Sequence, residues 1–509
     1  MLLIARVGED LPETLTARRP AAVLRRAGAL AADASALRGY DTLGGLAPGH
    51  RKLAPPHIVR VRVADRPQSH RGLSIARGVL CQTGRVTSLL PEQSGSSVLP
   101  RHLLNNVTTA LLDTRVVGVV GPRQAGKSTL VRQIVAERPE ATYASLDDAD
   151  VRALATADPQ GFVEGRPGLF VIDEIQRAPD LLLAIKSSVD RQPRAGRFLI
   201  TGSSQLSANR AVSETLAGRI ERHTLWPLSQ GEIERRPETF LSRLLDADLA
   251  TDWISKLDKQ SYLERSLAGG YPEARGRQGR RRRAGFNAYV QTVIEREAPG
   301  ISASPRTADL PRLLRLIAAR HAAVLNVSDL AADAQLPRTS VLRYLDTLEA
   351  LFLIVRIPAW SVNLSQREIR APKVYLTDSG LAGHLRRAEV AALLRPELAR
   401  GTDGPIIEGF VLTELLRQAS SAPDPPELAH YRDRDAEEID IIIEGPDGRV
   451  AAIEVKAGPG ATPAAVRNLI SLRDRLGTRF IAGVVLHSGP KGAQLGDRII
   501  SLPISALWA

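Results

Sequence analysis

The apolar positions in the central part of the chain form short continuous runs. Three of them cover residues 116–120, 169–172 and 198–202, and each is followed at once by glycine or polar residues. Apolar runs of this length, ended by turn residues, are typical of strands that are buried on both faces. The segment 128–137 instead carries its apolar residues at helical spacing. This alternation predicts an α/β domain with a parallel sheet.

The segment between the first strand and this helix has the spacing of a Walker A loop, Gly-Pro-Arg-Gln-Ala-Gly-Lys-Ser-Thr. Two glycines let successive backbone N–H groups curl around phosphates, Lys127 reaches the β and γ oxygens, and Ser128 or Thr129 supplies a hydroxyl to Mg²⁺. The sequence therefore predicts that ATP and Mg²⁺ are the cofactors. The predicted nucleotide-binding residues here are Gly121, Pro122, Arg123, Gln124, Ala125, Gly126, Lys127, Ser128 and Thr129.

Polar residues follow the other two strands and complete the predicted nucleotide site. Asp173 is expected to hold Mg²⁺ through water, and Glu174 to polarise the attacking water. The alternative for this pair is an ordinary helix cap after a strand. Ser203 follows the third strand and is expected at the same sheet edge. Arg219 is either a contact to the γ-phosphate, from its own or a neighbouring subunit, or a surface arginine.

Helical periodicity dominates from residue 231 to 301 and predicts a helical lid. An arginine cluster at 275–283 lies within it. Such a cluster is suited to neutralising phosphates of nucleic acid, and it is equally suited to being a solvated loop. Both interpretations stay open.

Residues 308–360 have the pattern of a winged helix. A helix at 310–318 is followed by one that opens at Val327 with Ser328 as its N-cap, a turn at 335–337, a third helix at 340–349 and a wing strand at 351–357. In helix-turn-helix units the second helix of the pair enters the DNA major groove. Protein docking is the alternative. The side chains that this helix would offer are Arg338, Thr339, Ser340 and Arg343.

A charged hairpin is predicted at 437–456, with its turn at 445–448. Pairing centred on Asp447 places Asp440 opposite Glu454, and strand alternation puts Lys456 on the same face as Glu454. Facing carboxylates repel unless a divalent metal and an ammonium group lie between them. We therefore predict a metal-dependent phosphodiesterase site in which Asp440 and Glu454 bind Mg²⁺ and Lys456 orients or deprotonates water, with Glu408 as a further carboxylate. The alternative is a charged edge hairpin.

The amino-acid composition and the distribution of charge limit the kinds of protein that carry these sites. Of the net charge of +12, a balance of +7 falls in residues 1–98, so the rest of the chain is only mildly basic. Residues 1–95 lack a sustained period and are expected to be an unstructured Arg-rich extension, unless the true start lies downstream. The single cysteine, Cys81, excludes an intrachain disulfide and a cysteine-based zinc site. With no apolar run near the roughly 18 residues that span a bilayer and no signal peptide, we expect a cytoplasmic protein without a membrane partner.

Several short motifs, in one order, resemble a known family. They are Leu99-Pro-Arg-His102, the Walker A loop, Ile172-Asp-Glu-Ile-Gln176, Thr201-Gly-Ser203, Ala217-Gly-Arg219, Gly270-Tyr-Pro272, Lys373-Val-Tyr-Leu-Thr-Asp-Ser-Gly380, Glu408, Asp440 and Glu454-Val-Lys456. Residues of about 98–490 resemble prokaryotic AAA-type P-loop ATPases that carry a C-terminal domain of unknown function, made of a winged helix and a PD-(D/E)xK, restriction-endonuclease-like core. The resemblance implies ATP binding and hydrolysis. Such relatives often form rings, so a homo-oligomer is a further prediction, with Arg219 and Arg296 as candidate trans-acting arginines.

The predicted fold class is α/β: a P-loop NTPase parallel sheet with a helical lid, a winged-helix module and a restriction-endonuclease-like α/β domain. The predicted parts are an extension at 1–95, the AAA-type ATPase domain at 96–230, the lid at 231–305, the winged-helix module at 306–372 and the nuclease-like domain at 373–509. Two functions compete. Either ATP turnover gates metal-dependent DNA cleavage, or the chain is a nucleotide switch whose C-terminal half binds DNA or protein without cutting.

Overall fold

The computed structural model describes residues 98–202, 215–301, 308–399, 401–433 and 437–508. The predicted extension at 1–95 and Ser203 lie outside these ranges. Within them the strands form a five-stranded, a three-stranded and a six-stranded sheet. Among the described helices, none is both long and apolar enough to cross a membrane.

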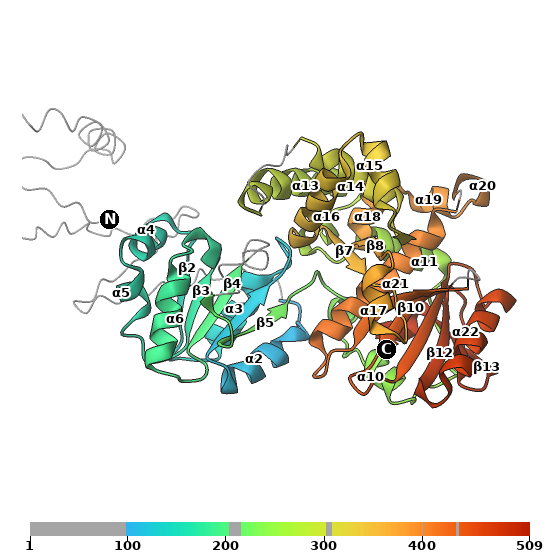
Figure 1. Ribbon diagram of the computed structural model, residues 1–509, viewed down its shortest axis with the longest axis horizontal. Helices are drawn as coiled ribbons and strands as arrows, with labels where there is room; N and C mark the ends of the chain where they lie inside the picture. The colour runs from blue at the N-terminus through green and yellow to red at the C-terminus, as the bar shows by residue number, and fades with distance from the viewer. Residues whose placement is uncertain (1–97, 203–214, 302–307, 400, 434–436, 509) are drawn as a thin grey trace, which may run out of the picture. The chain divides into compact units, whose positions relative to one another are not determined.

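The five-stranded sheet is parallel, in the order β2-β3-β4-β1-β5 (Figure 1). Its strands are β1 (Val116–Val120), β2 (Thr142–Ser145), β3 (Phe170–Asp173), β4 (Phe198–Gly202) and β5 (Ile220–Thr224). The three strands predicted from apolar runs are confirmed to within one residue. The helices around it are α2 (Leu103–Asp113), α3 (Lys127–Ala136), α4 (Ala149–Ala157), α5 (Pro159–Val163) and α6 (Leu181–Arg191), with the short helix η2 (Ile175–Arg177).

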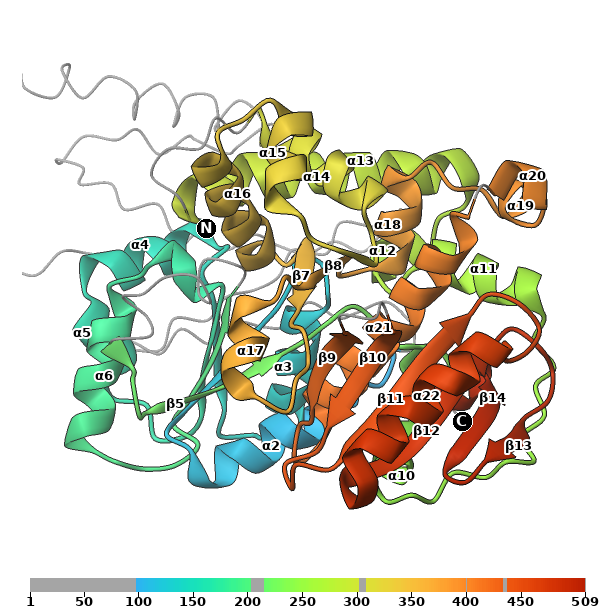
Figure 2. The same ribbon diagram turned by 45° about the vertical axis from the view of Figure 1, so that its right-hand side comes forward.

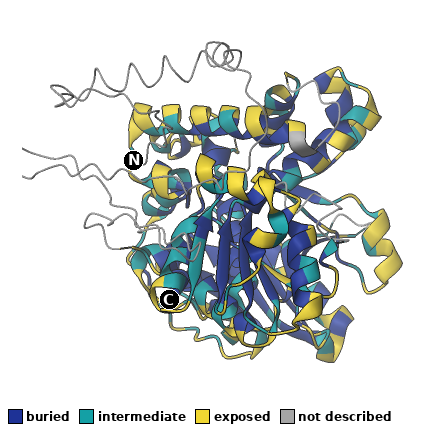
Figure 3. Ribbon diagram, turned by 90° about the vertical axis from the view of Figure 1, so that its left-hand side faces the viewer, coloured by how far each residue is buried: buried dark blue, intermediate teal, exposed yellow. Residues whose placement is uncertain are grey.

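The alternation of side chains along each strand explains why these runs are wholly apolar. Val116 and Val120 of β1 belong to a cluster with α5 and α6, whereas Val117 and Val119 pack with α2 and α3. Because both faces are covered, no position in β1 can be polar, and all five residues are buried. In Figure 3 the central strands are coloured as buried, whereas many of the exposed positions lie on helices.

A helical region follows the first sheet, as predicted. Its helices are α9 (Gln230–Glu234), α10 (Phe240–Leu245), α11 (Lys259–Ala268), α12 (Pro272–Arg275) and α13 (Gly279–Ile301). The arginines at 280–283 lie in the first turns of α13 and not in a loop, and Arg280, Arg281 and Arg283 are exposed.

The three-stranded sheet packs with three helices in a helix-strand-helix-helix-strand-strand order. The elements are α14 (Leu310–Ala319), β6 (Ala323–Val324), α15 (Val327–Ala334), α16 (Arg338–Ala350), β7 (Ile354–Ile357) and β8 (Lys373–Leu376), with α17 (Leu364–Ile369) between the last two strands. The sheet order is β6-β8-β7 and both pairings are antiparallel. The three predicted helices and the strand are present.

Two details of this region were predicted wrongly. The N-cap of α15 is Asn326 and not Ser328, because the Asn326 side chain accepts hydrogen bonds from the backbone N–H groups of Ser328 and Asp329. The predicted boundary at 372/373 is also wrong, because β8 pairs with β6 and β7 and so belongs to the same sheet as the module before it.

The six-stranded sheet is mixed, in the order β13-β14-β12-β11-β10-β9. Helix α21 (Asp403–Ser421) packs on one face and α22 (Pro463–Leu476) on the other, as Figure 2 shows for α22. The strands are β9 (Glu427–Arg432), β10 (Glu438–Glu444), β11 (Val450–Lys456), β12 (Phe480–His487), β13 (Ala493–Gly496) and β14 (Ile499–Pro503). The remaining elements are α18 (Ser379–Leu385), α19 (Val390–Leu393), α20 (Pro396–Ala399), η3 (Gly477–Arg479) and η4 (Ile504–Trp508).

Candidate functional site

The loop between β1 and α3 approaches its neighbours so closely that glycine is required. Gly121 has a φ of +144°, and a Cβ there would lie 2.3 Å from the carbonyl oxygen of Leu225. Gly126, with a φ of +103°, is the N-cap residue of α3 and offers no side chain to the first turn. The N–H groups at the start of α3 are therefore left for an anionic ligand.

Lys127 is buried at the centre of this loop, with 5% of its surface exposed. Its Nζ donates to the carbonyl oxygens of Gly121 and Pro122, each at 2.9 Å. Burial lowers the pKa of Lys127, while the charges of Glu174, Glu297 and Asp173 oppose this shift. The ammonium thus lies within electrostatic reach of both acidic residues that follow β3.

Asp173 and Glu174 lie at the carboxyl end of β3, as predicted. Asp173 is buried, and its carboxylate accepts hydrogen bonds from the hydroxyls of Tyr143, at 2.8 Å, and Thr201. Glu174 has a φ of +61° and precedes η2 without capping it through its side chain, so the helix-cap alternative is wrong for this residue. Burial raises the pKa of Glu174, opposed by Lys127.

Thr201 is a component that the site analysis of the sequence missed. It lies near the end of β4, and its hydroxyl oxygen also accepts a hydrogen bond from the backbone N–H of Glu174, at 3.0 Å. One threonine therefore fixes both acidic residues. The signal was available, because Thr201 follows three apolar residues on a strand that ends at the same sheet edge.

The other residues predicted to contact the nucleotide do not all lie at the P-loop. Ser128 and Thr129 lie in the first turn of α3, and Arg123 forms an ion pair with Glu297 of α13 at 3.1 Å. Arg219 precedes β5 and its carbonyl accepts from Val116, the first residue of β1, so it lies at the sheet edge opposite the P-loop. There it forms an ion pair with Asp190 at 2.5 Å. The prediction that Arg219 contacts a nucleotide in its own subunit is therefore wrong.

This donor set fits Mg²⁺ and ATP. The glycines leave room for phosphates beside an uncapped helix end, and a Cβ at Gly126 would meet only the Arg101 guanidinium, at 3.2 Å. A buried ammonium and the hydroxyl of Ser128 lie at the same helix end, and two carboxylates follow β3. Phosphate charge and a hard cation are what these groups bind.

The second predicted site, on the β10–β11 hairpin, has the expected register. Glu444 pairs with Val450 and Ile441 with Ile453, so Asp440 and Glu454 share a face. The backbone N–H of Val455 donates to the Asp440 carboxylate at 2.9 Å, and Lys456 Nζ forms an ion pair with Glu454 at 2.6 Å. Burial raises the pKa of Glu454, and the charge of Asp440 raises it further.

A lysine that the sequence analysis left without a role lies among these carboxylates. Lys373, from β8, has 1% of its side chain exposed. Its Nζ lies 2.9 Å from Glu438, 3.0 Å from Glu408 and 3.3 Å from Asp440. Burial opposes the charge on Lys373, but the three carboxylates raise its pKa overall. The Tyr375 hydroxyl donates to Glu408 at 2.6 Å, and burial raises the pKa of Glu408 to about 8.

The carboxylates of the predicted metal site face ammonium groups. Among the residues that the structure describes, no group of three or more His, Cys, Asp or Glu side chains is arranged to hold a metal ion. Glu408 and Asp440 face the Lys373 ammonium, and Glu454 faces that of Lys456. The Mg²⁺ ligand set of Glu408, Asp440 and Glu454 therefore stays a prediction, and in this structure ammonium groups neutralise these carboxylates.

A buried histidine holds the strand that carries Lys373. His321 Nδ1 accepts from the backbone N–H of Leu376 at 3.1 Å, and a Cβ on Gly409 of α21 would lie 1.9 Å from its Nε2. Burial lowers the pKa of His321 to about 3. The unfolded chain therefore binds a proton between about pH 6.5 and 3 that the folded chain does not.

We expect this histidine to make the protein less stable as the pH falls below 6.5. Between pH 7 and 5 the wild type should lose about 2 kcal/mol more of its free energy of unfolding than His321→Gln, whose side chain does not titrate. Urea unfolding at pH 7, 6 and 5 measures the difference. Parallel losses in both proteins would contradict the assignment.

Comparisons with known proteins match a domain over the residues of the first of these sites. Residues 113–234 match the family described as an AAA domain, and residues 259–391 and 403–507 match two domains of unknown function, DUF8612 and DUF4143. An uncharacterized protein of Mycobacterium tuberculosis, Rv2008c, is 30% identical over 444 residues, which cover 87% of this chain and 90% of that protein. The chain belongs to the Rv2008c family. The Mycobacterium bovis counterpart matches equally well.

Other relatives match a much shorter part of the chain. A methionine import ATP-binding protein, MetN 2 of Bacillus cereus, is 39% identical over 72 residues, 14% of this chain and 20% of that protein. Among solved structures, a Walker-type ATPase of Pyrococcus abyssi has a TM-score of 0.40 and 15% identity, covering 59% of this chain and 99% of its own.

The limits of the matched domains show which domain of this Rv2008c-family member contains each residue of the two sites. The AAA domain contains the P-loop, both acidic residues and Thr201. β8, with Lys373, falls within the DUF8612 match, whereas the carboxylates of Glu408 and Asp440 fall within DUF4143. The ion pairs of Lys373 with Glu408 and Asp440 therefore connect the DUF8612 and DUF4143 domains.

Proposed function

We propose that the chain binds Mg²⁺ and ATP at residues 121–129, hydrolyses the nucleotide, and uses its C-terminal domains to recognise a target without metal-dependent cleavage. The observation that carries the ATPase is the convergence of Lys127, Asp173 and Glu174 at an uncapped helix end. The AAA domain match at 113–234 supports it.

In this proposal each residue has one task. The N–H groups at the start of α3 bind phosphate, and the Lys127 ammonium exchanges its two carbonyl partners for phosphate oxygens. Ser128 and Asp173 would hold Mg²⁺, which when bound offsets the charge that develops on the phosphates. Glu174 orients the attacking water and accepts its proton. The Thr201 hydroxyl keeps Asp173 and Glu174 in place.

Lys127→Ala should weaken the affinity for a fluorescent ATP analogue by about 100-fold or more, because a buried charge-assisted contact to phosphate is lost. Fluorescence titration of the purified full chain in magnesium measures this. Lys186→Ala, on α6 of the same domain, is the matched control and should bind like the wild type. Equal affinity in Lys127→Ala and wild type would contradict the proposal.

For the C-terminal half, the position of Lys373 favours recognition over cleavage. The Lys373 ammonium group, 2.9–3.3 Å from three carboxylates, supplies positive charge to Glu408 and Asp440, two of the three carboxylates that the nuclease alternative assigns to the metal. The winged-helix interpretation of α14–β8 remains part of this proposal, and it is supported by the exposure of Arg338, Thr339 and Arg343 on α16. The partner bound there is either DNA or protein.

Incubation of wild type with DNA or RNA and Mg²⁺ or Mn²⁺ should therefore give no cleavage. Gel analysis of single- and double-stranded substrates, with Asp440→Ala and Lys456→Ala alongside, tests this. Cleavage by wild type that both variants lose would establish the nuclease alternative instead.

A further inference from the structure

Arg101, which precedes α2, joins the phosphate-binding loop to two other segments. It has 9% of its surface exposed. Its Nη1 donates to the carbonyl oxygen of Ala125 at 2.7 Å, its Nη2 to that of Trp226 at 2.6 Å, and its Nε forms an ion pair with Glu232 at 3.0 Å. The planar guanidinium thus fixes a loop carbonyl that is next to Gly126.

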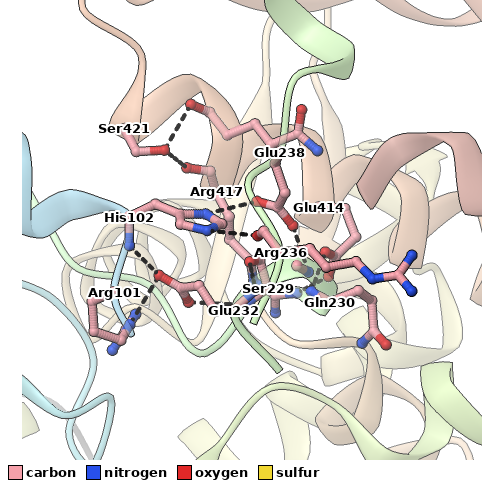
Figure 4. Close-up of polar contacts among 12 residues, drawn as sticks. Arg101, His102, Ser229, Gln230, Glu232, Arg236, Glu238, Glu414, Arg417 and Ser421 are labelled. Carbon is pink, nitrogen blue, oxygen red and sulfur yellow. Dashed lines mark hydrogen bonds and ion pairs between the residues drawn. The ribbon is translucent and has the colours of Figure 1, made fainter. Parts of the chain in front are cut away.

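Glu232 connects this arginine to the start of α9. Its carboxylate also accepts from the backbone N–H groups of His102, at 2.9 Å, and Ser229, at 3.1 Å. Ser229 and Glu232 form a reciprocal capping box on α9. Figure 4 shows Arg101 and His102 facing Glu232 from one side of the cluster, with Ser229 and Gln230 beside it. A shift of Arg101 would therefore move the first turn of α9.

From α9 the buried polar contacts continue into the C-terminal domains. The backbone N–H of Gln230 donates to the Glu414 carboxylate of α21 at 2.7 Å. Glu414 forms an ion pair with Arg417, whose guanidinium lies 3.5 Å from Asp378. Asp378 in turn accepts from the backbone N–H of Gly270 at 2.7 Å. Glu414 and Asp378 have no exposed surface.

A buried charge without a partner destabilises the protein, so only a few arrangements of these side chains are stable. The contacts form one continuous path from Ala125 in the P-loop to Glu414 of α21, more than 280 residues later in the chain. A ligand that moves the Ala125 carbonyl must therefore either rearrange the whole path of contacts or leave one of its buried polar groups unpaired, which costs free energy.

We propose that Arg101 positions the phosphate-binding loop and couples nucleotide binding to the C-terminal domains through Glu232, Gln230 and Glu414. This inference rests on the proposed function, because it requires that the loop binds ATP. Arg101 is a positioning residue in this scheme and contacts the protein side of the loop.

Hydrogen exchange of the full chain, with and without ATP and Mg²⁺, tests the coupling directly. In the wild type, ATP should change the exchange rate of amides in segment 228–234 and in α21 by about tenfold. Arg101→Lys keeps the charge but not the planar fork. We expect it to bind ATP about tenfold more weakly and to lose the exchange change in α21.

Two further variants distinguish a loss of coupling from misfolding and from a purely structural effect. The pair Arg101→Ala with Glu232→Gln leaves no buried unpaired charge and should also lose the exchange change. Arg191→Ala removes an exposed ion pair with Glu164 in the same domain and should behave as wild type. Wild type that binds ATP without any exchange change in α21, or Arg101 variants that keep it, would overturn the coupling.

A double-mutant cycle gives a second readout. Glu414→Gln lies at the far end of the path, and its effect on ATP affinity should be non-additive with that of Arg101→Lys by at least about threefold. Additive effects would overturn the inference. Wild type with no ATP affinity would instead overturn the proposed function itself, and the coupling with it.

Discussion

Glu174→Gln should bind ATP with wild-type affinity and hydrolyse it about 10²–10⁴ times more slowly. Glutamine keeps the size and one acceptor oxygen of glutamate, so the contacts around β3 are preserved. It cannot accept a proton from water. The raised pKa of Glu174, which burial causes, makes this carboxylate a better proton acceptor than an exposed one.

Two measurements separate these expectations. Phosphate release at saturating ATP reports turnover, and fluorescence titration reports affinity. Glu137→Gln, an exposed glutamate just after α3, is the control and should retain full turnover. Full turnover by Glu174→Gln would exclude Glu174 as the general base, whereas loss of binding would indicate a role in holding the nucleotide.

Lys373→Met should destabilise the protein by about 3–5 kcal/mol, the usual effect of removing one partner from a buried ion pair. The ammonium group is the shared partner of Glu408, Glu438 and Asp440. Without it, three carboxylates face one another. Mn²⁺ is a suitable replacement for the lost charge, so millimolar Mn²⁺ should raise the Tm of Lys373→Met and leave that of wild type unchanged.

Thermal unfolding with and without Mn²⁺ measures both effects. Lys491→Met replaces an exposed lysine and is the control for loss of positive charge. If Mn²⁺ stabilises wild type as strongly as Lys373→Met, the site accepts a cation despite its lysine, and the nuclease alternative gains ground. If Lys373→Met has wild-type stability, the lysine does not neutralise the cluster.

Much of the nucleotide site could be predicted because its determinants are local. The strand at 116–120, the glycine loop and the helix from Lys127 follow one another within 21 residues, and spacing alone places the lysine at the helix end. The strand that ends at Asp173 was found the same way. The role of Thr201 was not predicted, because it depends on β4 lying next to β3, and the local sequence pattern does not give the order of strands in the sheet.

Two of the errors, at Arg219 and at the 372/373 boundary, arose because the neighbours of a residue depend on distant segments, whereas the error at the cap of α15 is local. Arg219 lies near the other motifs in sequence, but a parallel β5 places the start of the strand at the edge away from the P-loop. Asn326 and Ser328 both suit an N-cap, and only the backbone shows which one reaches the free N–H groups. The boundary at 372/373 failed because β8 pairs with strands on the N-terminal side of it.

The sequence by itself determined the elements whose partners lie close along the chain: the P-loop, the apolar strands and the register of the β10–β11 hairpin, where a turn fixes which residues face each other. Tertiary structure alone decided which charge neutralises which. Lys373 meets Asp440 across 67 residues, and Arg101 meets Glu232 across 131. Carboxylates in a low-dielectric interior must find a positive partner, but many lysines and arginines could supply it, and only the packing of separate domains selects one.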